Sequence, residues 1–132
     1  MCIASPGISE FSELYLNAKA NCKEIISEIE FAYRESEEDS IWIAITGTNG
    51  KTTTTQLTNH ILRDANINSV AVGNIGKTCI SCVDGKPKFY VAECSSYQLA
   101  STNFFCPCAC AILNITPDHI KWHKNLDNYK KA

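Results

Sequence analysis

The stretch Ile41-Trp42-Ile43-Ala44-Ile45-Thr46-Gly47-Thr48-Asn49-Gly50-Lys51-Thr52-Thr53-Thr54 decides the fold of this chain. It opens with an unbroken apolar run, which is typical of a strand that is covered on both faces, as in a parallel sheet. The glycines that follow allow the backbone to turn tightly around an anion, and the helix expected after them contributes partial positive charge. The stretch therefore predicts a strand, a phosphate loop and a helix, in that order.

The loop also carries side chains suited to nucleotide chemistry. The ammonium of Lys51 can reach terminal phosphates, and the Thr52 hydroxyl can bind Mg2+. The general phosphate-loop pattern has its first glycine where this chain has Ile45, so the motif is the shorter Gly-x-x-Gly-Lys-Thr of residues 47–52. A glycine turn with an incidental lysine is the alternative interpretation. The strand before the loop and the helix after it favour binding of ATP with Mg2+.

The composition excludes several classes of protein. The chain has 132 residues, of which 45% are hydrophobic and 20% charged, as in an ordinary globular domain. Its net charge of −2 indicates no basic surface for nucleic acid or for an anionic membrane. The sequence has no apolar run long enough to span a membrane and no signal peptide. We therefore expect a cytoplasmic protein without a nucleic-acid partner.

The sequence contains 8 cysteines, which a cytoplasmic phosphate-loop protein would keep reduced. One interpretation pairs Cys79-x-x-Cys82 with Cys106 and Cys108 as a zinc site. However, Cys106, Cys108 and Cys110 alternate within a strand-like run, so they share one face and their spacing indicates packing. We expect the cysteines to act mainly as small apolar side chains.

Several local patterns predict the elements around the phosphate loop. Ser27 and Glu30 form a capping-box pattern that opens a helix, and Asp84-Gly85-Lys86-Pro87 indicates a turn. Four apolar positions are expected to give the helix after the phosphate loop an inward face: Leu57, Ile61, Leu62 and Ala65. His60 and His123 have no supporting motif, and we interpret both as exposed.

Further apolar segments predict strands, each followed by polar residues where open α/β sheets place their ligands. These are Ser69 to Val72 before Gly73-Asn74-Ile75-Gly76, Phe89 to Ala92 before Glu93, and Ala109 to Ile115 before Asp118 and His119. A carboxylate such as Glu93 at the end of a buried strand is costly unless it is paired, binds a cation or reaches solvent. Asp118 and His119 could likewise bind metal or position a phosphorylated intermediate. The predicted fold class is α/β, a phosphate-loop domain with a mostly parallel sheet flanked by helices.

Taken in order, the motifs of this chain resemble those of the Mur ligases. They are Ser5-Pro6-Gly7-Ile8, Gly47-Thr48-Asn49-Gly50-Lys51-Thr52-Thr53, Gly73-Asn74-Ile75-Gly76, Glu93-Cys94-Ser95-Ser96-Tyr97-Gln98-Leu99 and Leu113-Asn114-Ile115-Thr116-Pro117-Asp118-His119. The third and fourth motifs resemble the D-glutamate-adding branch more than the other branches or folylpolyglutamate synthetase. The resemblance implies an ATP-dependent amide ligase of peptidoglycan synthesis, which joins D-glutamate to UDP-N-acetylmuramoyl-L-alanine through an acyl phosphate.

The resemblance also implies roles for single residues. The ATP-binding residues would be Gly47, Thr48, Asn49, Gly50, Lys51, Thr52 and Thr53. Lys51 would stabilise charge on the transferring phosphoryl group, and the catalytic residues would be Lys51, Glu93 and His119. Thr52 and Glu93 would hold one Mg2+ ion, and His119 would hold a second.

The substrate-binding residues and the domains follow from the same resemblance. Asn74 and His119 would contact the uridine-linked substrate, and Gly7 would lie at the edge of the uridine-binding domain. Residues 1–26 would be the C-terminal end of that domain, and residues 27–132 the N-terminal half of the ATP-binding central domain. The parent protein is expected to be a monomer.

Two features of the family pattern bear on activity. Lys121 stands where the family usually has a carboxylate, and the family's tyrosine-x-x-alanine-lysine segment matches Tyr129-Lys130-Lys131-Ala132, after which its carbamate-forming lysine would come. Both ends of the chain look cut, so we expect a portion of a ligase that is inactive by itself. The alternatives are a non-catalytic Mg-ATP-binding module and a related ligase that uses another amino acid or a folate.

Overall fold

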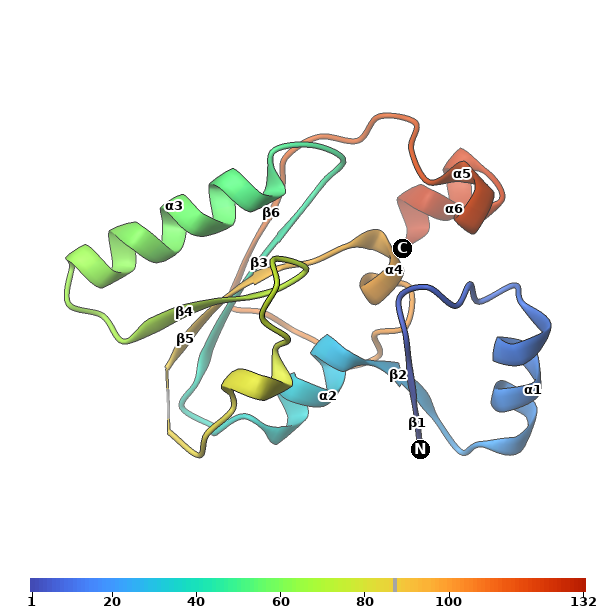
Figure 1. Ribbon diagram of the computed structural model, residues 1–132, viewed down its shortest axis with the longest axis horizontal. Helices are drawn as coiled ribbons and strands as arrows, with labels where there is room; N and C mark the ends of the chain where they lie inside the picture. Colours follow the sequence, from blue (N-terminus) through green and yellow to red (C-terminus); the bar gives the residue numbers. More distant parts are fainter. Residues whose placement is uncertain (87) are drawn as a thin grey trace.

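The computed structural model describes residues 1–86 and 88–132, which form two parallel sheets with helices around them (Figure 1). Pro87, the last residue of the predicted turn that starts at Asp84, lies outside the described residues. The smaller sheet pairs β1 (Cys2–Ala4) with β2 (Ile25–Ser27). The larger sheet carries the phosphate loop.

The larger sheet has the strand order β4-β5-β3-β6, and every pair of neighbours is parallel. Its strands are β3 (Ile41–Thr46), β4 (Ser69–Gly73), β5 (Phe89–Glu93) and β6 (Ala109–Ile112). Ile45 and Gly73 both lie opposite Glu93, so the carboxyl ends of β3, β4 and β5 meet at one level. The predicted α/β class with a parallel sheet is confirmed.

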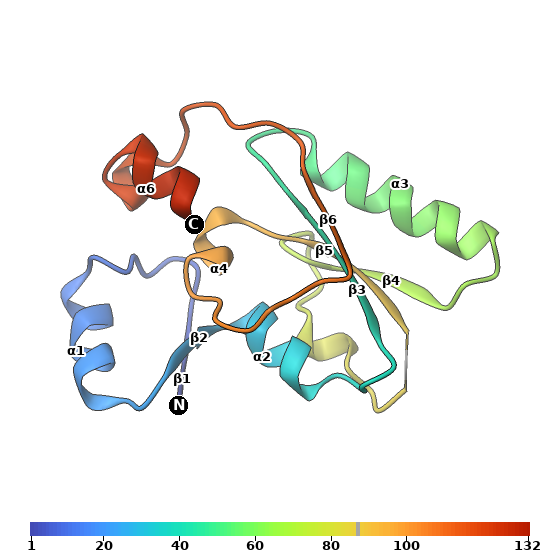
Figure 2. The same cartoon turned by 180° about the vertical axis from the view of Figure 1, so that it is seen from behind.

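Helices cover both faces of the larger sheet. α3 (Lys51–Asp64) lies along one face, whereas α2 (Glu28–Glu35) and the short 3-10 helix η1 (Ile80–Cys82) lie on the other (Figures 1 and 2). Trp42 of β3 stacks on Tyr90 of β5 with ring centroids 4.4 Å apart, and both belong to one buried cluster with Ile29 of α2. A large part of the core therefore lies between the sheet and α2.

The face that α3 turns to the sheet differs from the prediction. Thr55 is buried, whereas the exposed fractions of Leu57 and Ile61 are 55% and 58%. Ala65 is also exposed, and Leu62 is half-buried. The predicted inward face was wrong at Leu57, Ile61 and Ala65, because the phosphate loop fixes the rotation of the helix at its first residue. The small side chain of Thr55 then faces inward where the pattern predicts larger apolar ones.

The described residues also form α1 (Glu13–Asn21), α4 (Ser96–Leu99), α5 (Ile120–His123) and α6 (Leu126–Lys131). The N-terminal turn contacts α5, since Trp122 Nε1 donates to the Pro6 carbonyl at 3.1 Å and Ser9 Oγ donates to the Trp122 carbonyl at 2.8 Å. Segments from opposite ends of the sequence are therefore neighbours. Across the described ranges, none of the helices has the length and apolar character needed to cross a membrane.

Glu30 has a different role from the one that its spacing predicts. Ser27 Oγ accepts from the Glu30 N–H at 3.3 Å, as in a capping box, but the Ser27 N–H donates to the Ser101 carbonyl. The Glu30 carboxylate is fully buried and accepts from the backbone N–H groups of residues 103–105 and from Arg34 Nε. Only the serine half of the predicted capping box forms. The Glu30 carboxylate does not return to the Ser27 N–H, because the loop of residues 103–105 offers it several N–H donors.

The cysteines differ in burial, and three of them, Cys2, Cys22 and Cys82, are half-buried. Cys79 and Cys94 are fully buried, and burial raises the pKa of the Cys94 thiol to about 12. Cys106, Cys108 and Cys110 are exposed, so the prediction that this alternating run packs was wrong. The run leads into β6, which is the last strand at one edge of the sheet. Within residues 1–86 and 88–132, no three side chains of histidine, cysteine, aspartate or glutamate gather as a metal site would require.

Candidate active site

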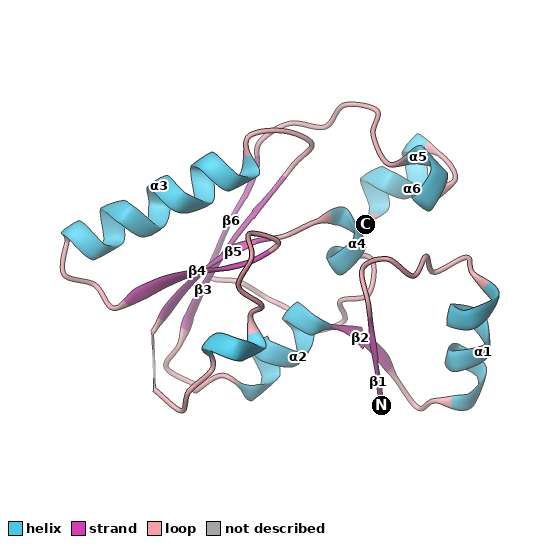
Figure 3. Ribbon diagram, in the orientation of Figure 1, coloured by secondary structure: helices cyan, strands magenta, loops and turns pink. Residues whose placement is uncertain are grey.

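The phosphate loop lies between the carboxyl end of β3 and the first turn of α3, beside the segment that follows β6 (Figure 3). Gly47 has a φ of 135°, and a Cβ atom there would come within 3.0 Å of the Asn114 carbonyl oxygen. Only glycine combines this backbone conformation with so close an approach. The Thr48 N–H donates to the same carbonyl at 3.0 Å. β6 ends at Ile112 and not at the predicted Ile115, because the chain beyond it pairs with the loop.

Lys51 lies at the start of α3 with its ammonium against the loop itself. Its Nζ donates to the carbonyl oxygens of Gly47 at 2.7 Å and Thr48 at 3.0 Å. A phosphate oxygen can replace these carbonyls, because charged acceptors form stronger hydrogen bonds than neutral ones. The other predicted ATP-binding residues of the loop and first turn, Asn49, Gly50, Thr52 and Thr53, are exposed and therefore open to a ligand.

Glu93 is a buried carboxylate beside the phosphate loop. Only 2% of the residue is exposed, its Oε2 accepts from Thr52 Oγ1 at 2.7 Å, and its Oε1 accepts from Asn74 Nδ2 at 3.1 Å. Among the residues that the structure describes, Glu93 has no ion-pair partner. A carboxylate in this environment favours a bound cation, because burial of an unpaired charge is costly. The structure thus brings Thr52, Asn74 and Glu93 together.

The end of β4 places Asn74 on this carboxylate. Gly73 has a φ of 95°, and a Cβ atom there would collide with the Glu93 carbonyl oxygen. The Asn74 N–H donates to that same oxygen at 3.0 Å. Any residue larger than glycine at position 73 would separate the strand ends, so the glycine is what allows the Asn74 amide to reach the Glu93 side chain.

His119 and Gly7 lie apart from the Thr52 and Glu93 side chains. His119 Nδ1 is 3.5 Å from Asp118 Oδ1, and its ring packs on Tyr97 with centroids 4.7 Å apart. Gly7 lies in the N-terminal turn, where the space around its Cα is open among the described residues. In the described part of the chain, no hydrogen bond or ion pair joins either residue to Thr52 or Glu93. A ligand would have to connect them to that pair.

His123 is a buried residue that sequence reasoning missed. It is fully buried, its Nε2 lies 2.9 Å from Ser96 Oγ, and the rings of Tyr97 and Tyr129 pack against it. Burial lowers the pKa of the imidazole, and the nearby His119 lowers it further. The prediction that His123 is exposed was wrong, whereas His60 is exposed as predicted. The residues that bury His123 come from other segments, so no local pattern in the sequence indicates its burial.

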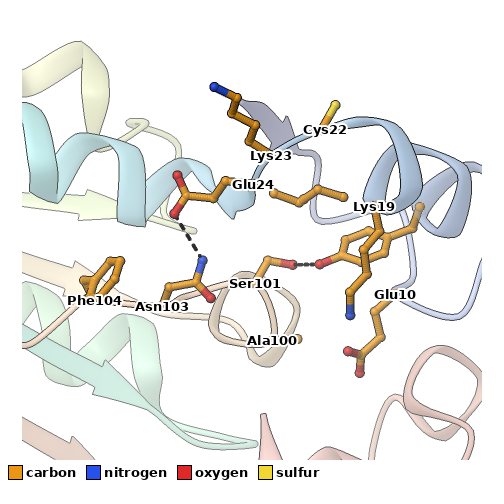
Figure 4. A pocket seen from close by; sticks show the side chains of 11 residues that line it. Glu10, Lys19, Cys22, Lys23, Glu24, Ala100, Ser101, Asn103 and Phe104 are labelled. Carbon is orange, nitrogen blue, oxygen red and sulfur yellow. Dashed lines mark hydrogen bonds between the residues drawn. The ribbon is translucent and has the colours of Figure 1, made fainter.

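A cavity of about 240 Å³ borders the phosphate loop and is lined by Gly47, Ser96 and Tyr129 among others. A larger cavity of about 820 Å³ lies between α1 and the loop after α4 (Figure 4). In it, Asn103 Nδ2 donates to Glu24 Oε1 at 3.5 Å. The larger cavity shares no lining residue with the predicted site.

The parallel sheet, the phosphate loop and the buried carboxylate at the strand ends define a phosphate-loop α/β domain. The model of the family described as "Mur ligase middle domain" matches residues 45–132. The chain therefore belongs to the Mur ligase family, as the motifs predict.

Curated relatives align with the whole chain. UDP-N-acetylmuramoylalanine–D-glutamate ligases from Caldicellulosiruptor saccharolyticus, Alkaliphilus oremlandii and Clostridioides difficile are 43%, 44% and 41% identical to it. Each alignment covers 100% of this chain but only 29% of the first two relatives and 30% of the third. The chain thus spans less than a third of the length of these relatives, and their names describe much longer proteins.

Proposed function

We propose that this chain serves an ATP-dependent ligase that joins D-glutamate to UDP-N-acetylmuramoyl-L-alanine in peptidoglycan precursor synthesis. The observation that carries the proposal is the buried Glu93 carboxylate, bonded by Thr52 and Asn74 beside the phosphate loop. The names of relatives about two-fifths identical over the whole chain support the choice of substrates. We place this chemistry in the cytoplasm, where precursor and ATP are available.

The reaction needs two displacements. The terminal carboxylate of the precursor attacks the γ-phosphorus of ATP, and ADP leaves. The amine of D-glutamate then attacks the acyl carbon, and phosphate leaves with the electrons of the broken C–O bond. The nitrogen releases a proton, which leaves a neutral amide. Residues 47–53 would surround the ATP phosphates, with the backbone N–H groups of the first turn of α3 directed at them. The Lys51 ammonium would neutralise charge that develops on the transferring phosphoryl group. The chain's contribution is therefore orientation and electrostatics.

The residues around Glu93 fit Mg2+. A hydroxyl from Thr52 and a carboxylate from Glu93 are the oxygen ligands that this ion prefers, and the carboxylate has no cation among the described residues. When bound, Mg2+ would screen the charge of the ATP phosphates. We also propose that His119 holds a second ion, that Asn74 and His119 contact the precursor, and that Gly7 lies near its uridine end.

The proposed ligase function implies a division of the chain between two domains. We propose that residues 1–26, which include the small β1-β2 sheet, end a uridine-binding domain, and that residues 27–132 begin the ATP-binding domain. The family match at residues 45–132 supports the second part.

Calorimetry with Mg-ATP on this chain tests the phosphate-loop assignment. Lys51→Ala should weaken binding at least tenfold, because it removes the positive charge nearest the terminal phosphates. Lys86→Ala, an exposed lysine of the turn before β5, is the matched control and should bind as the unaltered chain does. Equal affinity of the Lys51→Ala variant and the control would contradict the assignment.

The substrate assignment requires the whole protein. With UDP-N-acetylmuramoyl-L-alanine and a panel of amino acids, D-glutamate should be the preferred nucleophile, and ADP and phosphate should form in equal amounts. Preference for another amino acid or for a folate would contradict this proposal and would indicate a related ligase instead. For the 132 residues alone we expect nucleotide binding without ligase turnover, since they span 29–30% of the relatives.

A further inference from the structure

The loop crest, defined here as Thr48 and Asn49, is held by residues far along the chain. Asn114 Oδ1 accepts from the Asn49 N–H at 2.9 Å, and Asn114 Nδ2 donates to the Asn49 carbonyl at 2.9 Å. Thr48 Oγ1 accepts from the Thr116 N–H at 2.9 Å and lies 3.2 Å from the Thr116 carbonyl oxygen. Its third neighbour is the Tyr129 hydroxyl, at 2.9 Å. The crest is therefore bonded to the segment after β6 and to α6.

The contacts of Thr48 decide the direction of its bond with Tyr129. A threonine hydroxyl has one proton and two lone pairs. Thr48 donates its proton to the Thr116 carbonyl and accepts from the Thr116 N–H. The remaining lone pair then accepts the Tyr129 proton. With this assignment every donor and acceptor of the Thr48 hydroxyl is used.

Tyr129 is a fixed donor and not a mobile surface group. It is 8% exposed, and its ring packs on His123 with centroids 5.3 Å apart. Its backbone N–H donates to the carbonyl of Asn125, the residue that caps α6. The position of its hydroxyl is therefore set by the packing of α6, and any displacement of that helix would move or break the bond to Thr48.

We propose that the Tyr129 hydroxyl is a positioning group for nucleotide binding. It acts through Thr48 to hold the loop crest, whose own N–H groups are bonded to Asn114, in the conformation that directs the N–H groups of the first turn of α3 at phosphate. This inference rests on the proposed nucleotide site and adds α6 to it. Tyr129 acts only through Thr48, because its hydroxyl is committed to that side chain. Loss of the hydroxyl would leave the crest bonded by Asn114 and Thr116 and less well ordered.

Hydrogen exchange on the ligand-free chain tests the positioning directly. Tyr129→Phe should speed exchange of the Thr48 and Thr116 amides about threefold to tenfold, the effect of losing one hydrogen bond. Amides in the middle of β3 should not change. Tyr90→Phe, which removes a hydroxyl bonded to the Cys82 carbonyl, is the matched control and should leave the loop crest unaffected.

The affinity of the chain for Mg-ATP tests whether the bond between Tyr129 and Thr48 contributes to nucleotide binding. Tyr129→Phe should weaken binding about threefold to tenfold, and Thr48→Val by at least as much, because valine also loses the two bonds to Thr116. The double variant should bind no more weakly than Thr48→Val, since the bond between Thr48 and Tyr129 is already absent from that single variant. Thr48→Ser retains the hydroxyl and should bind within about twofold of the unaltered chain. Urea unfolding of each variant shows whether it is folded under the binding conditions.

The outcomes separate the two proposals. Unchanged exchange at the loop crest in Tyr129→Phe, or affinity losses that multiply in the double variant, would overturn the positioning role. Failure of the unaltered chain to bind Mg-ATP would overturn the proposed nucleotide site, and failure of Thr48→Ser to retain affinity would show that the hydroxyl is not what Tyr129 acts upon. Faster exchange together with non-additive affinity losses supports both.

Discussion

At the scale of single residues, the site depends on polar side chains that are buried with few partners. Glu93 is 2% exposed and is bonded only to neutral groups in the described part of the chain, and His123 is fully buried with its Nδ1 atom unpartnered there. Both groups cost free energy of folding that ordinary core residues would not. Substitution can therefore show what Glu93 and His123 each contribute to stability and to binding.

Replacement of Glu93 by glutamine should separate stability from metal binding. In the absence of Mg2+, Glu93→Gln should raise the free energy of unfolding by about 1 kcal/mol, because an uncompensated buried charge is removed and the amide keeps the shape. Binding of ATP should lose its dependence on Mg2+. Urea unfolding and calorimetry measure the two effects, with the loop variant Glu38→Gln as control. A variant that is less stable than the unaltered chain and still requires Mg2+ would contradict this role.

His123 should make stability depend on pH. Burial and His119 depress the folded-state pKa of this imidazole below its value in the unfolded chain. The unfolded state therefore binds more protons, so the contribution of His123 is complete above the unfolded pKa and is lost as pH falls through the folded one. Between about pH 7.5 and pH 5.5, the unfolding free energy should fall more for the unaltered chain than for His123→Gln. His60→Gln, at an exposed position, should keep the unaltered dependence. Parallel curves for all three proteins would contradict the assignment.

At the scale of elements, polar contacts between residues far apart in the sequence fix how α2, β2 and the loop after α4 pack together. Glu30 of α2 receives the N–H groups of residues 103–105, and Arg34 adds bonds to both Glu30 and Glu24. Arg34 lowers the pKa of the Glu24 carboxyl, mainly through its hydrogen bonds. These contacts join α2, β2 and the loop after α4, and so place the small sheet beside the larger one.

Loss of the Glu30 carboxylate should destabilise this junction. Glu30→Ala should lower the free energy of unfolding by about 3 kcal/mol, because backbone N–H groups and a guanidinium lose a buried charged acceptor. Glu35→Ala, at the exposed end of the same helix, should change it by less than about 0.5 kcal/mol. Urea unfolding gives both values. A loss below about 1 kcal/mol for Glu30→Ala would show that water replaces the carboxylate at little cost.

At the scale of the whole molecule, apolar side chains remain exposed on α3 and, separately, at the β6 edge of the larger sheet. Ile112 of β6 is 65% exposed, and Leu57 and Ile61 of α3 are 55% and 58% exposed. β6 pairs only with β3 among the described strands, so its other side offers unpaired N–H and C=O groups. A strand edge of this kind that carries an exposed apolar side chain such as Ile112 favours association with another chain.

We expect the 132-residue chain to associate through this edge when it is studied alone. Sedimentation velocity over a wide concentration range should show dimers or larger species, and Ile112→Lys should shift the distribution toward the monomer, since a charged edge opposes strand pairing. Leu16→Lys on α1, where the native side chain is 54% exposed, is the control and should associate as the unaltered chain does. A chain that stays monomeric throughout would contradict the expectation.

The sequence alone predicted the parts of the fold that are encoded over short distances. The apolar run of residues 41–45, the glycine loop and the following helix appear as β3, the phosphate loop and α3. The segments before Asn74 and Glu93 form β4 and β5, and their shared register brings the two side chains together. Parallel strands place their carboxyl ends at one edge, so the juxtaposition of strand-end residues could be inferred without coordinates.

Only the tertiary structure decided which polar groups are buried and what binds them. The Glu30 bond to Phe105 spans 75 positions, the His123 contact with Ser96 spans 27, and the Thr48 contact with Tyr129 spans 81. The inward face of α3 and the exposure of Cys106, Cys108 and Cys110 likewise depend on which elements lie beside them. Hydrophobic periodicity and capping patterns describe interactions within a few residues of each other, so they predict elements. The partners of a buried charge or hydroxyl are set by the packing of elements, which local patterns do not encode.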